Sequence, residues 1–366
     1  MTARPSGRAA APGRPVRLPS AGSVLRLVVA LGLTAFILWK SDPALVWRIA
    51  AGARPGPLVA AILLVVVDRT LMAWRWLWLL MPFTPAPVPA DAPAPDGVPA
   101  RPHVGLGAIL HVFFVSSFVG TFLPASVGGD AVRATAMARL GVPMADAVAS
   151  VFMDRVLGVL GILAMGVVGL WLARDLLGRP ELLAAILVAL AVTAAGCAAV
   201  AAAVFSARVA AFLIALLQRL PWARVHAAGS AVVGAVQRYN AHHGLLTVVT
   251  LASIGVQVLR VLQAWCLGLA LGIDTPLTTY FAFIPIILLV MLLPVTVNGL
   301  GTSQVGFVVC FASAGVGKPQ AFALSVLFVA LGIVGNLPGG VLWTRSGLTP
   351  APATPLTDAL PPRGPV

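Results

Sequence analysis

The chain has 366 residues, of which 60% are hydrophobic and only 10% are charged. Several apolar runs approach or exceed the ~20 residues that a helix needs to cross a bilayer, and a soluble core could not hide them. The net charge of +13 would suggest nucleic acid for a soluble protein, but the arginines lie mainly in connecting segments and tails, where membrane proteins carry orientation signals. We therefore predict an all-α polytopic membrane protein and expect no nucleic-acid partner.

The N-terminal part predicts two spans behind a basic tail. Residues 1–21 contain four arginines and no acid, so we expect them in the cytoplasm. The apolar run at 22–40 is not followed by a small-residue cleavage site and is predicted to be a retained span. A second span is predicted at 57–80. Asp68 lies near its middle, where a carboxylate needs a cation on another helix.

The next segments predict a chain that turns back inside the membrane. A loop at 81–102 holds eight prolines and separates the second span from an apolar run at 105–122. That run ends in LPASVGG at 123–129, and the following stretch, 130–146, is too polar to span. We predict a re-entrant hairpin, which a membrane tolerates only where protein or a water-filled cavity shields the irregular backbone.

Three spans are predicted next, at 148–172, 182–205 and 244–272. Before the third of these, residues 206–243 contain four arginines and three histidines without an acid, interleaved with apolar residues. This pattern favours interfacial helices on an anionic leaflet. The third span carries Arg260, which is deep enough that it should face a cavity or a partner rather than lipid.

A second broken run occurs near the C-terminus. The run at 277–292 ends in LPVTVNG at 293–299, and apolar limbs follow at 303–316 and 320–343. The tail at 345–366 is rich in proline and is predicted to be disordered.

The two broken segments predict two diverged halves. Leu, Pro, Val and the last Gly of LPASVGG recur in place in LPVTVNG. Three crossings lie between the two segments, so the second hairpin should enter from the opposite face. We predict about six full spans plus two re-entrant hairpins in two inverted halves, within a membrane transport domain at 22–344. Matching Gly/Pro-broken segments of this kind point to a transporter's binding site.

The helix starts behind the two motifs form the predicted site. A half-helix N-terminus exposes N–H groups and a partial positive charge, which suit a phosphate head group, and glycine lets a ligand approach the backbone. The candidate binding residues are Ser126, Gly128, Gly129, Asp130, Arg133, Asp154, Arg155, Arg260, Thr296, Asn298, Gly299, Gly301 and Gln304, with Asp68 and Arg75 as supporting intramembrane charges. We expect the two motifs to face one shared cavity.

Ionisable groups inside a membrane should face the protein interior and pair with one another. The charges expected there are Asp68, Arg69, Arg75, Asp130, Arg133, Asp154, Arg155 and Arg260. For Asp68 we expect a cationic neighbour among Arg133, Arg155 and Arg260.

The order of several motifs resembles the lysylphosphatidylglycerol synthase transmembrane-region family, whose members are related to the N-terminal half of bacterial multiple-peptide-resistance factors. The resemblance rests on AWRW at 73–76, GGDAVR at 128–133, MDRVLGVL at 153–160 and LPVTVNGLG at 293–301. It implies a flippase-like, multi-pass protein of the bacterial plasma (inner) membrane with a cytoplasmic N-terminus.

Three positions depart from the pattern of that family. Gly158 stands where the family tends to carry an acid, Gln304 where it usually has a Glu, and no Arg occurs around residues 328–330. The resemblance therefore supports the fold more strongly than it supports a lysyl-lipid substrate.

No enzyme is expected from the motifs. The sequence contains no zinc-protease, hydrolase or P-loop motif and no Cys/His metal set, so no metal, cofactor or nucleotide site is predicted. The favoured function is a lipid translocase that moves an anionic or modified lipid between leaflets. Two alternatives stay open: a non-transporting scaffold or lipid-binding partner of an envelope lipid-synthesis enzyme, and the membrane subunit of a lipid aminoacyl- or glycosyltransferase.

Overall fold

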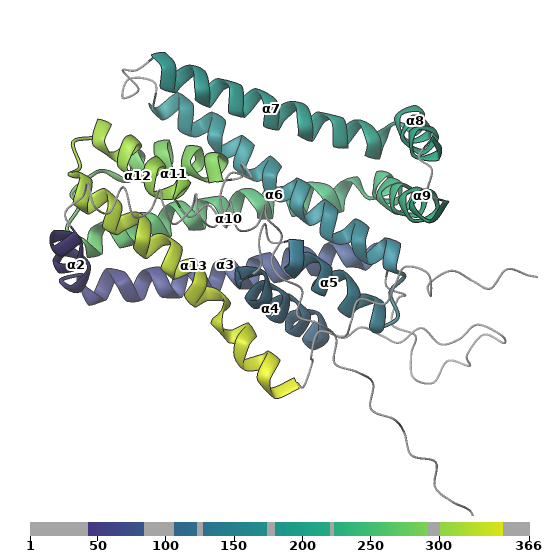
Figure 1. The fold of residues 1–366 in the computed structure, drawn as a ribbon, viewed down its shortest axis with the longest axis horizontal. Helices are drawn as coiled ribbons and strands as arrows, with labels where there is room; N and C mark the ends of the chain where they lie inside the picture. Colours follow the sequence, from purple (N-terminus) through teal and green to yellow (C-terminus); the bar gives the residue numbers. More distant parts are fainter. Residues whose placement is uncertain are drawn as a thin grey trace, which may run out of the picture.

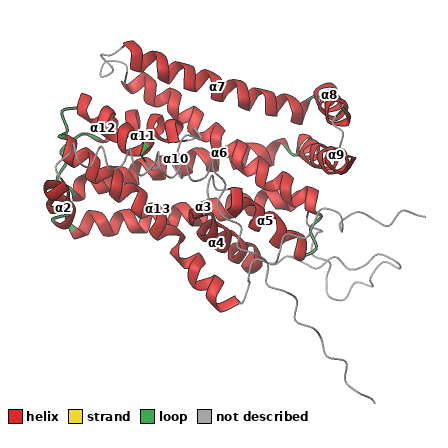
Figure 2. Ribbon diagram, viewed as in Figure 1, coloured by secondary structure: helices red, strands yellow, loops and turns green. Residues whose placement is uncertain are grey.

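The structure is a computed structural model that describes residues 43–83, 106–122, 127–173, 180–219, 223–291 and 301–346. Within these ranges the chain is helical and has no strand (Figure 2), which confirms the all-α prediction. Five of the described helices are long and apolar enough to cross a membrane. They are α3 (Pro55–Leu80), α6 (Met144–Ala173), α7 (Pro180–Phe205), α10 (His243–Ala270) and α13 (Lys318–Ser346). The sixth predicted span, 22–40, lies outside the described residues.

Helices α3 and α10 pack antiparallel along the length of the bundle (Figure 1). At one end the Arg54 N–H donates to the carbonyl oxygen of Ala270 at 2.8 Å. At the other end the Tyr239 hydroxyl donates to the carbonyl oxygen of Leu79 at 2.6 Å. This pair therefore sets the two ends of the bundle against which the other helices can be placed.

Two pairs of shorter helices form hairpins, as predicted for the two broken runs. The first joins α4 (Leu106–Phe122) to α5 (Val127–Arg139), and the second joins α11 (Leu277–Met291) to α12 (Thr302–Ser313). A Cβ on Gly129 would lie 2.6 Å from the carbonyl oxygen of Ser116, so glycine is what lets α5 approach α4 this closely. The connecting residues, 123–126 and 292–300, lie outside the described part of the chain.

The two hairpins begin at opposite ends of the bundle. The start of α4 lies beside the end of α3, because Ile109 packs in one buried cluster with Leu79, Phe83 and Tyr239. The start of α11 lies at the other end, where the Tyr280 ring packs against α10 at Gly268. Three spanning helices, α6, α7 and α10, separate the hairpins along the chain, as the crossing count predicted.

The helices of the two hairpins interlock with the long helices. Helix α5 packs on α6, which follows it, and α12 packs on α13, which follows it. In addition, α4 contacts α13 and α11 contacts α6, so the first helix of each hairpin lies against the long helix behind the other hairpin. These four contacts therefore form two matching pairs.

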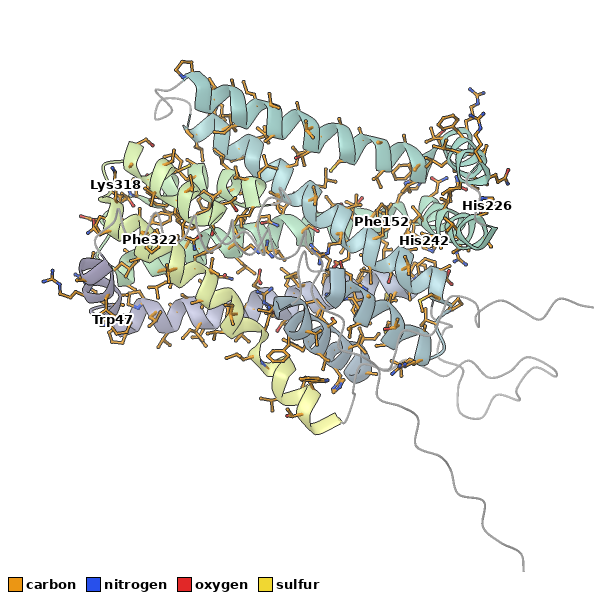
Figure 3. All side chains as sticks on the ribbon, viewed as in Figure 1. Trp47, Phe152, His226, His242, Lys318 and Phe322 are labelled. Atoms are coloured by element: carbon orange, nitrogen blue, oxygen red, sulfur yellow. The ribbon has the colours of Figure 1, made fainter. Side chains whose placement is uncertain are left out.

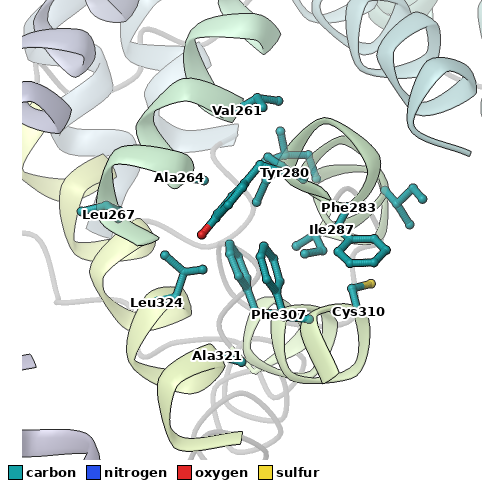
Figure 4. Packing of buried hydrophobic residues seen from close by; sticks show 14 of the residues in the cluster. Val261, Ala264, Leu267, Tyr280, Phe283, Ile287, Phe307, Cys310, Ala321 and Leu324 are labelled. Atoms are coloured by element: carbon teal, nitrogen blue, oxygen red, sulfur yellow. The ribbon is translucent and has the colours of Figure 1, made fainter. Parts of the chain in front are cut away.

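The contact between α6 and α11 depends on small residues and a proline. Pro285 lies inside α11 and has no N–H to donate to the carbonyl of Phe281. Gly169 of α6 is buried against this stretch, and a Cβ there would lie 2.7 Å from the carbonyl oxygen of Ala282. On its other side α11 contributes Tyr280, which points toward Ala264 in an aromatic and aliphatic core (Figure 4).

The described parts of the basic segment at 206–243 are mainly helical and lie at one end of the bundle (Figure 1). It comprises α8 (Ala207–Gln218), α9 (Ala223–Gln237) and the short helix η3 (Arg238–Ala241). Phe212 of α8 is 67% exposed, which fits a helix that lies on a membrane surface. Burial raises the pKa of Tyr239 in η3, so its hydroxyl stays neutral and serves as a donor to α3.

Two short elements complete the ends of the bundle. Helix α2 (Pro43–Ala51) precedes α3 and carries Trp47, which is 74% exposed. The 3-10 helix η1 (Met81–Phe83) extends α3, and Phe83 packs edge-on against Tyr239. Trp47 and Lys318 lie at one end of the molecule, and His226 and His242 lie at the other (Figure 3).

The small-residue contact of α6 predicts a position-dependent effect of adding a methyl group. Gly169→Ala should destabilise the protein by about 1–3 kcal/mol, because backbone atoms of α11 would have to move. Gly196→Ala on the exposed face of α7 is the matched control, since a Cβ there meets nothing within 4 Å. Thermal unfolding in detergent measures both, and equal melting temperatures would contradict the tight packing described for Gly169.

The arrangement of the ends predicts the outcome of side-specific labelling. In a background without the native cysteines, single cysteines at Arg139 and Asn240 should react from the same side of the membrane. A cysteine at Lys318 should react from the opposite side. All three positions are exposed. Labelling of intact cells with an impermeant maleimide measures this, and accessibility of Arg139 and Asn240 from opposite sides would refute the re-entrant first hairpin.

Candidate functional site

One cavity of about 440 Å³ lies between the two hairpins and the long helices. Residues of α3, α4, α5, α6, α10, α11 and α13 line it. All eight charged residues expected inside the membrane are among them: Asp68, Arg69, Arg75, Asp130, Arg133, Asp154, Arg155 and Arg260. Five arginines against three aspartates leave two positive charges in excess.

Asp154 holds two of the arginines in the most buried part of the site. Its Oδ1 accepts from Arg75 Nε at 2.8 Å, and its Oδ2 accepts from Arg133 Nη1 at 3.1 Å. Arg75 also donates to Ser253 Oγ at 2.9 Å. The three side chains are at most 9% exposed. Helices α3, α5 and α6 are thereby joined through one carboxylate.

The guanidinium of Arg133 is also covered by aromatic rings. Its Cζ lies 4.8 Å from the ring centroid of Trp76 and 4.9 Å from that of Phe113. These faces of the rings attract a cation and shield it from lipid. Arg133 reaches this position because Gly129, one turn earlier, allows α5 to lie against α4.

A second ion pair lies at the more open side of the cavity. Arg155 Nε donates to Asp130 Oδ2 at 2.9 Å, and Arg155 Nη2 donates to Asp130 Oδ1 at 3.1 Å. The Arg155 side chain is 52% exposed, so water screens this pair more than it screens the contacts of Asp154.

Asp68 lies between two arginines without a close hydrogen bond. Arg69 Nη1 and Arg260 Nε are each 3.7 Å from one of its carboxylate oxygens. The contact with Arg260 confirms that a predicted cation accompanies Asp68, whereas Arg133 and Arg155 pair with other aspartates. Since Asp68 is 1% exposed, its charge depends on these two arginines.

The cavity also contains two uncharged amide side chains. Gln257 of α10 and Asn336 of α13 line it, and the side-chain oxygen of each has no hydrogen-bond partner within the described ranges. Asn336 instead uses its Nδ2 to donate to Thr121 Oγ1 at 2.8 Å. The remaining wall is apolar and is formed by Ile162, Leu288, Met291, Phe328, Val329 and Ile333, among others.

The predicted site residues fall into three groups. The first group lines the cavity and consists of Gly129, Asp130, Arg133, Asp154, Arg155 and Arg260, together with the supporting charges Asp68 and Arg75. Gly128, Gly301 and Gln304 are described but do not line it. Ser126, Thr296, Asn298 and Gly299 lie outside the described residues.

The start of α12 has its own cap. Gly301 has a φ of 86°, which favours glycine, and its N–H donates to Gln304 Oε1 at 2.6 Å. Ser303 Oγ donates to the same oxygen at 2.9 Å. The Gln304 side chain therefore satisfies backbone of its own helix. The last turn of α11 does reach the cavity, through Leu288 and Met291.

Some cavity residues were not among the predicted site residues. They are Ser116, Ser117 and Thr121 of α4, Gln257 and Gln263 of α10, and Asn336. The glutamines share a polar stripe with Arg260 on an otherwise apolar span, which is the signal that could have found them. The α4 hydroxyls gave no comparable signal, because serine and threonine in apolar helices often bond to their own backbone.

Comparison with known proteins gives one match. The family model described as "Lysylphosphatidylglycerol synthase TM region" matches residues 23–339. No curated protein and no solved structure matches the chain.

The double contact of Asp154 predicts a large effect of its removal. Asp154→Ala leaves two buried arginines without their shared anion and should cost roughly 3–5 kcal/mol of stability. Asp130→Ala removes a partner of the half-exposed Arg155 and should cost no more than about 1 kcal/mol. Thermal unfolding of the purified variants in detergent compares them, and an Asp154→Ala protein as stable as Asp130→Ala would contradict the role given to Asp154.

Proposed function

The chain belongs to the lysylphosphatidylglycerol synthase transmembrane-region family, and on that premise we propose that it binds a lipid with an anionic head group in the cavity and moves it between leaflets. It is an integral membrane protein related to lipid modification or translocation. The lipid and the movement are the parts that we add.

The excess of two positive charges is the observation that carries this proposal. A charge inside a membrane is unfavourable unless a partner of opposite sign lies nearby. The three aspartates cannot neutralise five arginines, and Arg260 approaches its carboxylate only to 3.7 Å. A phosphate would supply the missing negative charge. Its oxygens would accept hydrogen bonds from guanidinium N–H groups that the aspartates do not use.

The apolar wall supports a lipid over a small soluble anion. Leu288, Met291 and Phe328 face the same cavity as Arg260. Acyl chains would leave the polar part of the cavity along such a wall and continue into the bilayer. A free anion would gain nothing from these contacts.

The reciprocal packing of the hairpins supports movement across the membrane. Helix α4 of the first half packs on α13 of the second half, and α11 of the second half packs on α6 of the first half. Halves with opposite orientation can rock around one site and open it to either face without a nucleotide. We infer that the two halves are such an inverted repeat.

The pairing of the three aspartates with arginines supports a non-enzymatic role. Asp68, Asp130 and Asp154 are each held by at least one arginine within 3.7 Å. A carboxylate held in this way already serves as the counter-ion of an arginine. We therefore propose binding and transport, not chemistry, for these groups.

The second candidate is a protein that binds lipid without transporting it. Seven of the eight cavity charges come from α3, α5 and α6, and only Arg260 comes from the second half of the chain. A site this uneven suits a fixed binding role, as in a scaffold or subunit beside a lipid-synthesis enzyme.

The orientation is part of the proposal. Arg208 lies in α8 and Arg219 caps the C-terminus of that helix, at the end of the bundle where α6 begins and where Arg139 ends α5. By the positive-inside rule this end faces the cytoplasm of a bacterial plasma membrane. The span predicted at 22–40 would place the N-terminus on the same side.

Transport should depend on the charge of Arg260. In proteoliposomes without nucleotide, the wild type should move fluorescent phosphatidylglycerol between leaflets, and Arg260→Gln should slow this by about tenfold or more, as expected for the loss of one charge-assisted bond of about 1.5–3 kcal/mol. Dithionite quenching measures the rate. Arg219→Gln, an exposed position outside the cavity, is the control with the same charge change. A wild type that binds the lipid without moving it would favour the second candidate.

A further inference from the structure

The cavity holds hydrogen-bond acceptors that lack donors. Gln257 Oε1, Asp68 Oδ1 and Asn336 Oδ1 have no hydrogen-bond partner among the described residues. Gln257 is 2% exposed and Asp68 is 1% exposed. They come from α10, α3 and α13, and all three residues line the cavity. Buried acceptors of this kind are unfavourable unless a ligand or water donates to them.

These acceptors lie in a site that already has too much positive charge. Gln257 precedes Arg260 by one turn of α10, and the same arginine faces Asp68. An ammonium group could donate to the acceptors, but it would add a charge of the same sign as the excess. A hydroxyl group donates without adding charge, so it fits both the acceptors and the arginines.

The space beside Arg75 leads to the same conclusion. Gly158 lines the cavity, and a Cβ there would lie 3.5 Å from Arg75 Nη2, which is an ordinary contact distance. A carboxylate could therefore stand at this position, next to the arginines. Glycine leaves the positive excess in place, which disfavours a cationic head group.

We infer that the ligand is a phospholipid whose single phosphate carries a neutral polyol, such as glycerol or inositol, and that aminoacylated, cationic head groups are disfavoured. The arginines bind the phosphate. The side-chain oxygens of Gln257, Asp68 and Asn336 accept hydrogen bonds from the hydroxyl groups. This inference rests on the proposed function, because it names the head group of the lipid that the same cavity would bind.

Binding of four short-chain lipids to the purified full-length protein tests the inference. Dioctanoyl phosphatidylinositol and phosphatidylglycerol carry a polyol, phosphatidylmethanol has the same charge without free hydroxyl groups, and lysylphosphatidylglycerol is cationic. We expect the two polyol lipids to bind about tenfold more tightly than phosphatidylmethanol, as expected for one or two buried hydrogen bonds. Lysylphosphatidylglycerol should bind most weakly.

Two substitutions separate the hydroxyl contacts from the charge. Gln257→Leu should remove most of the preference for polyol lipids and leave phosphatidylmethanol binding unchanged within about twofold. Gln218→Leu, at an exposed site on α8 outside the cavity, is the matched control and should change neither. Gly158→Asp should weaken all anionic lipids and strengthen lysylphosphatidylglycerol. If either variant does not fold, the ranking of the four lipids by the wild type still decides.

The possible results have distinct meanings. Equal binding of phosphatidylinositol and phosphatidylmethanol, or tightest binding of lysylphosphatidylglycerol, would overturn the polyol inference while lipid binding itself stood. Binding of none of the lipids would overturn the proposed function as well. Inositol 1-phosphate that binds as tightly as the intact lipid would show that the site takes a soluble polyol phosphate, which overturns the lipid part.

Discussion

Asp154 receives two arginines from helices that are far apart in the sequence, and the interior of the protein depends on this contact. Each guanidinium alone would be unfavourable at membrane depth, and the carboxylate alone would be unfavourable too. Together, Arg75, Asp154 and Arg133 join α3, α6 and α5 and are covered by Trp76 and Phe113. The first hairpin cannot leave its place against α6 without exposing these charges.

The two hairpins pack against helices from the opposite half of the chain. A chain that turns inside a membrane leaves peptide groups without partners, and these need protein or water around them. The contacts of α4 with α13 and of α11 with α6 place each hairpin against the opposite half of the chain. Three of the four hairpin helices, α4, α5 and α11, also line the polar cavity.

The two halves share an arrangement of helices but differ in chemistry. The first half supplies most of the charges, through α3, α5 and α6. The second half supplies a packed core in which Tyr280, Phe307 and Phe311 lie together, and Gln304 serves the cap of its own helix. One half is therefore suited to hold a polar head group, and the other is suited to give a firm apolar wall.

The sequence alone determined the class of protein, five of the six predicted spans, the two helix pairs and the identity of the charged residues. The reason is that apolar length, charge in an apolar run and Gly/Pro breaks are local signals. It predicted that Asp68 has a cationic neighbour, but not that Asp154 is shared by Arg75 and Arg133. Pairing depends on which helix faces overlap, and a single chain without that geometry offers several partners for each carboxylate. The tertiary structure also decided that Gly129 serves the packing of α5 on α4, and that Gln304 turns away from the cavity toward its own backbone. Both outcomes follow from distances across helices, which the order of residues along the chain does not contain.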